Sequence, residues 1–175
     1  GDLKGLRVAY SPDLGHARVD PEVAALVRDA AAVFADMGAD VEEVTPAWGA
    51  DGPELIRFFW AAHELRFRRY LGEWADKMDP GLVACIGEAG DPSALDYLTM
   101  RQRKLDYVAA LHTWFEDWDL LLTPAVSTPA FPADRLQPAH WPAHDWDWVS
   151  WAEFSYPFNF SHSPAASIPC GFTEA

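Results

Sequence analysis

Leu6-Arg7-Val8-Ala9-Tyr10 is the first stretch of the chain with a clear structural preference. It is short, apolar and rich in strand-favouring residues, and Gly5 and Ser11-Pro12-Asp13 bound it, so it predicts a β-strand. Working outward from it, we expect a helix from Pro21 to Met37 and a second strand from Val41 to Val44. Strand, helix and strand within the first 44 residues indicate a βαβ-like unit over residues 1–45, whose strands are usually parallel.

The helix of this unit has recognisable signals at both ends. Asp20 is a good N-cap, Pro21 suits the first helical position, and Gly38 is placed to end the helix. Apolar side chains recur at helical spacing and predict its core-facing side: Val23, Leu26, Val27, Ala30, Phe34 and Met37.

Residues 53–118 are predicted to form a helical region. One amphipathic helix is expected from Pro53 to Trp74 and a short one from Pro80 to Glu88. A long helix follows Asp91-Pro92-Ser93 and should end near Trp118. The apolar face expected for this long helix comprises Leu98, Leu105, Val108, Leu111 and Phe115.

Residues 119–175 begin with a short buried strand over Asp119–Leu122. The segment 123–142 contains five prolines and shows no clear period, so it predicts a long ordered loop, and such loops are usually functional. Four of the nine tryptophans lie between Trp141 and Trp151, and we expect them to pack against the protein or at an interface. A final helix or strand segment should end the chain.

The overall composition is that of one ordinary globular domain, with 175 residues, 50% of them hydrophobic and 23% charged. Asp and Glu total 27 against 13 Lys and Arg, a net charge of −14, so we expect no nucleic acid and no anionic membrane as partner. No apolar run approaches the roughly 18 residues that a membrane span requires. Cys85 and Cys170 are far apart and outside any CxxC motif, which indicates two reduced, buried thiols in a cytoplasmic protein.

No complete catalytic or metal-binding motif is present in the sequence. It lacks a G-x-S-x-G elbow, a phosphate-binding G-x-x-x-x-G-K-[ST] loop and a G-x-G-x-x-G turn. His140 and His144 are spaced like two ligands on one helix face, but Pro142 between them would break that helix. We therefore expect no metal and no cofactor, and we interpret the arginines at 66, 68 and 69 as a solvated or ion-paired face rather than an anion site.

The segment Phe158–Phe172, FNFSHSPAASIPCGF, resembles the stretch F-N-x-x-G-x-P-A-x-S-x-P-x-G-F of amidase signature enzymes. Leu3–Tyr10 with the helix that follows it, Met37–Val44 and Trp118–Pro124 also agree with the family in order and spacing. Together these stretches span nearly the whole chain. The resemblance implies an α/β fold in which helices pack around part of a mixed β-sheet.

The same resemblance implies hydrolysis of a carboxylic amide to an acid and ammonia or an amine, through a serine activated by a second serine and a lysine. In the family these residues lie upstream of the matched region, so no catalytic residue is expected in this chain. The chain begins at Gly1 without an initiator methionine and stops at Ala175 after an apolar segment, as expected of a piece of a longer protein. We therefore expect the C-terminal portion of an amidase, inactive alone.

The expected partners of such a portion are the upstream part of the same polypeptide and, in the complete enzyme, a small-molecule amide. Exposed apolar surface would also allow a homodimer. Two alternatives stay open: a stand-alone, non-enzymatic α/β module that binds a protein, and a relative of the amidotransferases that act on tRNA-bound substrates. An exposed apolar face where the absent part would dock favours the fragment over the stand-alone module.

Five residues are candidates for the wall of the substrate pocket. Thr123 and Pro124 begin the long loop, and Asn159, His162 and Ser167 lie in the segment that resembles the family. His162 stands where the family usually has glycine, a position that needs either a positive φ or a close approach of the backbone. Histidine is a poor general substitute for either.

Overall fold

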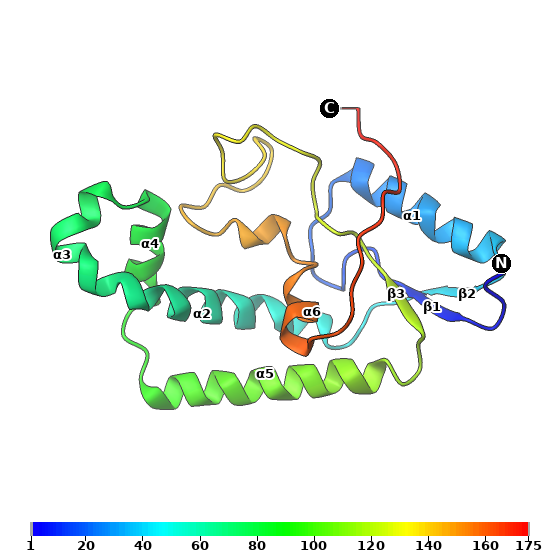
Figure 1. The fold of residues 1–175 in the computed structure, drawn as a ribbon, viewed down its shortest axis with the longest axis horizontal. Coiled ribbons are helices and arrows are strands. Elements are labelled where there is room, and N and C mark those ends of the chain that lie inside the picture. Colours follow the sequence, from blue (N-terminus) through cyan, green and yellow to red (C-terminus); the bar gives the residue numbers. More distant parts are fainter. Residues whose placement is uncertain (1, 175) are drawn as a thin grey trace.

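A computed structural model describes residues 2–174 and shows an α/β fold (Figure 1). Its sheet contains β1 (Arg7–Tyr10), β2 (Asp40–Glu43) and β3 (Leu120–Leu122) in the order β2-β1-β3. Both pairings are parallel, and Val8 of the central strand lies opposite Val41 on one side and Leu120 on the other. The predicted α/β class and βαβ unit are confirmed. Gly1 and Ala175, the ends on which the fragment expectation partly rests, lie outside the described residues.

The crossover helix α1 (Pro21–Asp36) begins and ends as its end signals predict. The side chain of Asp20 accepts a hydrogen bond from the Glu22 N–H, and Gly38 adopts a φ of 97° directly after the helix. Met37 was expected on the core face, but it is the C-cap residue and lies exposed. The helical period cannot be extended across the residue at which the helix ends.

The helix predicted over Pro53–Trp74 is wrong as a single element. The structure has α2 (Gly52–Glu64), a 3-10 helix over Leu65–Tyr70 and the one-turn α3 (Leu71–Trp74), followed by a 3-10 turn over Ala75–Lys77. Within the tighter segment, the guanidinium of Arg68 contacts the Gly90 carbonyl and the Asp91 carboxylate beyond the end of α4 (Pro80–Ala89). This contact with a distant turn accompanies the change of helix type and the return of α4 along α2.

The long helix α5 (Ala94–Trp114) starts with a capping box, in which Ser93 and Asp96 satisfy each other's backbone N–H groups. It ends at Trp114, earlier than the expected Trp118. Leu98 and Leu105, predicted on its apolar core face, are 55% and 51% exposed. Apolar residues occur on both sides of α5, and the core takes the side that carries Met100, Tyr107 and Leu111.

The core lies between the sheet, α2, α5 and α6 (Tyr156–Ser161). Its buried members, Leu14, Ala17, Trp48, Leu55, Met100, Tyr107, Leu111 and Phe154, come from segments far apart in the sequence. The rings of Trp48 and Tyr107 meet edge to face with 5.7 Å between their centroids. A smaller cluster of Ala61, Cys85 and Trp146 joins α2, α4 and the tryptophan-rich segment.

The segment after β3 is irregular, as expected, with one 3-10 turn at Val149–Trp151 before α6. The packing predicted for the tryptophan-rich stretch is confirmed at Trp141 and Trp146, which are buried. After α6, residues 163–174 have no helix or strand, and Figure 1 shows this segment running back toward α1. There Gly171 lies against Leu26, and the Glu174 N–H donates to Glu22.

The two cysteines are unpaired, but only one of them is buried. Cys85 is in the small core cluster, where burial raises the pKa of its thiol to about 11. Cys170 is exposed, contrary to the expectation, because it lies in the uncovered segment after α6. None of the helices described in residues 2–174 combines the length and hydropathy of a bilayer-spanning helix.

Candidate functional site

Thr123 and Pro124 lie where β3 ends, beside the carboxyl end of β1. The hydroxyl of Thr123 donates to the carbonyl of Ser11 at 2.9 Å, and Pro124 is completely buried. These contacts hold the start of the long loop against the edge of the sheet at which ligands of parallel α/β folds usually bind.

Asn159 and His162 lie at α6 and its C-terminal cap, and both are exposed. His162 has φ 55° and ψ 25°, the left-handed conformation, which confirms that this position needs a positive φ. Next to it, the hydroxyls of Ser161 and Ser163 are 2.8 Å apart, and the Ser161 carbonyl lies 3.2 Å from Nε2 of His112 on α5. The turn is therefore anchored on both sides of the histidine.

Ser167 lies further along the exposed segment after α6. The five pocket candidates thus occupy three places: the end of β3, the end of α6, and the final segment. Their role as the wall of a substrate pocket stays a prediction.

A buried polar network around Glu153 was not foreseen from the sequence. Glu153 is only 5% exposed, yet its carboxylate accepts hydrogen bonds from Arg57 Nη2 at 2.8 Å and from the Tyr156 hydroxyl at 2.9 Å. Nε2 of His16 lies 3.3 Å from the same carboxylate and 3.2 Å from the Tyr156 hydroxyl. Burial alone would raise the pKa of Glu153, but the bonds from His16, Arg57 and Tyr156 outweigh it and lower the pKa below its ordinary value.

Arg57 extends this network to a second carboxylate. Its Nε donates to Asp147 at 2.7 Å and its Nη1 donates to the Pro53 carbonyl at 3.1 Å. Burial alone would lower the pKa of Arg57, but the bonds to Glu153 and Asp147 raise it, so the guanidinium stays charged. The network joins α2, the loop after β1, the tryptophan-rich segment and α6.

The network is suited to holding these segments together rather than to attacking a substrate. Burial first, and the adjacent Glu153 second, raise the pKa of Tyr156, so its phenol stays a neutral donor. No local pattern could have revealed the network, because Arg57 and Glu153 are 96 positions apart and Tyr156 and His16 are 140 apart.

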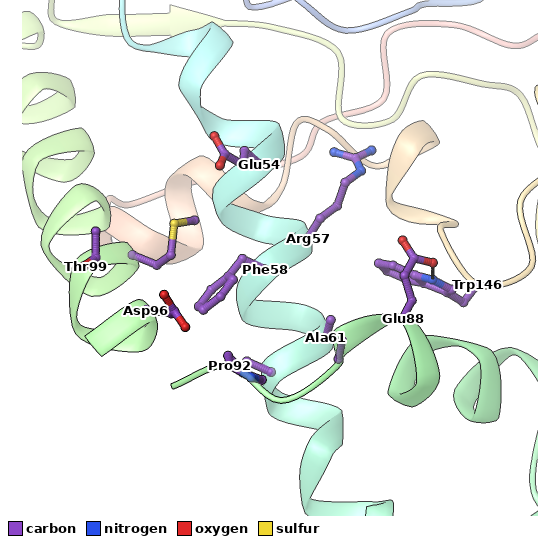
Figure 2. A pocket seen from close by; sticks show the side chains of 12 residues that line it. Glu54, Arg57, Phe58, Ala61, Glu88, Pro92, Asp96, Thr99 and Trp146 are labelled. Atoms are coloured by element: carbon purple, nitrogen blue, oxygen red, sulfur yellow. Dashed lines mark hydrogen bonds between the residues drawn. The ribbon is translucent and has the colours of Figure 1, made fainter. Parts of the chain in front are cut away.

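The other prominent feature is an open groove of about 550 Å³ over α2, shown from close by in Figure 2. One face of α2 forms its floor, with residues at helical spacing: Glu54, Arg57, Phe58, Ala61 and Ala62. Pro92 and the first half of α5 form one side, through Asp96, Thr99 and Met100. The end of α4 and the tryptophan-rich segment form the other, through Glu88, Ala89 and Trp146. None of the five pocket candidates lines it.

Polar groups at the edge of this groove are fixed by contacts within the protein. Trp146 Nε1 donates to Glu88 Oε2 at 2.6 Å, and Glu54 pairs with Arg103 through two bonds of 2.7 and 2.9 Å. The bonds from Arg103 lower the pKa of Glu54, and the bonds from Ser93 lower the pKa of Asp96. Residues 2–174 contain no group of three or more His, Cys, Asp or Glu side chains placed to hold a metal ion.

Comparison with known proteins adds sequence relatives to this geometry. The family model described as Amidase matches residues 1–175. An acylamidase from Rhodococcus erythropolis is 32% identical over 181 residues, which cover 99% of this chain and 37% of the relative. A glutamyl-tRNA(Gln) amidotransferase polypeptide from Moorella thermoacetica, the one designated A, is 27% identical over 201 residues, covering 99% of this chain and 39% of that protein. The chain thus spans less than half the length of these relatives.

Solved structures show the same fold. A bacterial aryl acylamidase of the amidase signature family superimposes with a TM-score of 0.76 at 22% identity, over 99% of this chain and 38% of the other. The corresponding amidotransferase polypeptide from Thermotoga maritima does so with a TM-score of 0.66 at 18% identity, over 99% of this chain and 37% of the other. Because the family model matches residues 1–175 and the fold is shared, the chain belongs to the amidase family.

Proposed function

We propose that the protein hydrolyses carboxylic amides and that this chain supplies the C-terminal portion of the enzyme, which completes the sheet and shapes the substrate pocket. The observation that carries the proposal is the alignment of 99% of the chain with 37% of an acylamidase, within a family model that matches residues 1–175. Bond cleavage would then be the work of the serines and lysine that the family places upstream, and no residue of this chain is assigned a catalytic role.

Exposed apolar surface supports an incomplete fold. On α5, Leu95 is 73% exposed and lies on the same side as Leu98 and Leu105, opposite the buried face of the helix. In the segment after α6, Phe172 is 96% exposed. Side chains of this size are rarely gathered on a free surface, so we assign these faces to contacts with the upstream portion of the polypeptide. A homodimer would use the same surface.

Two further parts of the proposal concern the pocket and the location of the protein. Thr123 and Pro124 at the sheet edge, and Asn159, His162 and Ser167 in and after α6, are proposed to face the amide once the upstream portion is in place. The two unpaired cysteines support a cytoplasmic location, since thiols stay reduced there.

The proposal is tested with a chimera in which this chain replaces the matching portion of the Rhodococcus erythropolis acylamidase. We expect the chimera to release an amine from an acylamide, and both the truncated acylamidase and the isolated chain to release none. Amine can be quantified by chromatography, with the intact acylamidase as positive control. A folded, soluble chimera without hydrolysis would contradict the proposal, and turnover by the isolated chain would show that the reaction does not need the upstream portion.

The glutamyl-tRNA(Gln) amidotransferases are the second candidate, because sequences of this type from two different organisms match at 27% identity. Amide hydrolysis without a tRNA-dependent partner is preferred, since the acylamidase is more similar and the chain carries a net charge of −14.

A further inference from the structure

The groove over α2 combines an apolar floor with an acidic edge. Ala61, Met100 and Trp146 are buried beneath it, and Phe58 and Ala62 are partly buried. The alanines keep the floor shallow between the rings of Phe58 and Trp146, so that a flat ligand could lie there. A volume of about 550 Å³ is within the roughly 300–1,000 Å³ typical of small-molecule sites.

The charges around the groove have one dominant sign. The carboxylates of Glu54, Glu88 and Asp96 lie at its edge, on α2, α4 and α5, and all three residues are exposed. Arg57 is the one basic residue among those that line the groove in residues 2–174, and its guanidinium is already paired with Asp147 and Glu153. Figure 2 shows Arg57 reaching away from Phe58 and Asp96. A ligand in the groove therefore meets a negative potential.

We propose that this groove binds a small organic cation with an aromatic body, of the arylalkylammonium class. The ring packs on the apolar floor between Phe58 and Trp146, and the ammonium group lies toward Glu88, whose carboxylate is held in place by the indole N–H of Trp146. An anion of the same shape is repelled by the three carboxylates. The site is independent of the proposed amide hydrolysis, because it is defined by binding and shares no residue with the five pocket candidates.

The test compares three compounds of similar shape and different charge: 2-phenylethylammonium, 2-phenylethanol and phenylacetate. Binding to the chain is measured by titration calorimetry and by ligand-observed NMR at low ionic strength. We expect the cation to bind at least about fivefold more tightly than the alcohol, and the carboxylate to bind least. Added salt should weaken the cation and leave the alcohol unchanged.

Two substitutions locate the site, and two more control for indirect effects. Glu88→Gln keeps an acceptor for Trp146 and removes the charge, so cation binding should fall about two- to fivefold while alcohol binding stays the same. Ala62→Leu raises the floor and should weaken both ligands. The matched controls are Glu73→Gln, on the exposed part of α3, and Ala32→Leu, on the exposed side of α1.

Several outcomes would overturn the inference. Equal binding of the three compounds would remove the role of charge, and unchanged binding in both Glu88→Gln and Ala62→Leu would place the ligand elsewhere. Absence of binding to the chain would show that the groove is not a small-molecule site. If the chain binds the cation but a longer protein containing it does not, the groove is covered by another protein segment and the proposal is wrong.

Discussion

The βαβ unit and the segment from the end of β3 to α6 are held in place by different interactions. In the first, a parallel ladder joins β1 to β2, and the helix between them is capped by its neighbouring residue Asp20. In the second, residues 123–155 have one 3-10 turn, and distant side chains such as Arg57 and His16 fix it through Glu153. Backbone pairing tolerates side-chain changes, whereas a buried charge network depends on each member. The two regions should therefore respond very differently to single substitutions.

The largest effect is expected from Arg57→Ala. It leaves the largely buried carboxylates of Glu153 and Asp147 without their cation, and removal of one partner from a buried pair costs about 3–5 kcal/mol. The free energy of unfolding, measured by urea denaturation, should fall by that amount. Arg135→Ala is the control, because Arg135 pairs weakly and in solvent with Asp134, and it should change stability by less than about 0.5 kcal/mol. Similar losses in the two variants would show that the network does not hold the segment.

The pH dependence of stability should report on Glu153 in the same way. Its pKa is lower in the folded protein than in the unfolded chain, so its contribution is fully present above the unfolded value of about 4.3 and is lost as pH falls through the folded value. Urea unfolding at several pH values should therefore show that the difference between wild type and Glu153→Gln shrinks in acid. A difference that stays constant below pH 4 would mean that Glu153 is not ionised in the native state.

The βαβ unit should respond more mildly, as the N-cap of α1 illustrates. Asp20→Ala removes the acceptor for the Glu22 N–H and should cost about 0.5–2 kcal/mol of unfolding free energy. Asp20 also lies 2.9 Å from His140, in the irregular segment, so His140→Ala is needed to separate the two contacts. We expect Asp20→Asn to restore most of the loss, since asparagine is an equally good cap. A loss as large as that of Arg57→Ala would remove the contrast between the regions.

This contrast also explains which features the sequence could predict. The strands, α1 and the capping box at Ser93 follow from residues within a few positions of one another, so local patterns are sufficient. The break after Glu64 depends on contacts of Arg68 more than 20 positions away, and no local period reports it. The network around Glu153 and the groove over α2 are likewise products of tertiary packing. Of the pocket candidates, only the backbone requirement at His162 could be anticipated, because a glycine position in a family carries a conformational meaning.

The smallest effect is expected at His162, where the irregular region relies on backbone conformation. A residue with a Cβ at φ 55° costs roughly 1–2 kcal/mol, and glycine removes that cost. Glycine also loses about 0.4–1 kcal/mol more conformational entropy on folding, so His162→Gly should be slightly more stable than wild type, by roughly 1 kcal/mol or less. His162→Val, which is β-branched and disfavours this conformation most, should be less stable than both. Urea denaturation of the three proteins gives the order. If glycine is the least stable, the imidazole makes contacts that outweigh the backbone cost, and side chains rather than backbone govern this turn as they govern the rest of the region.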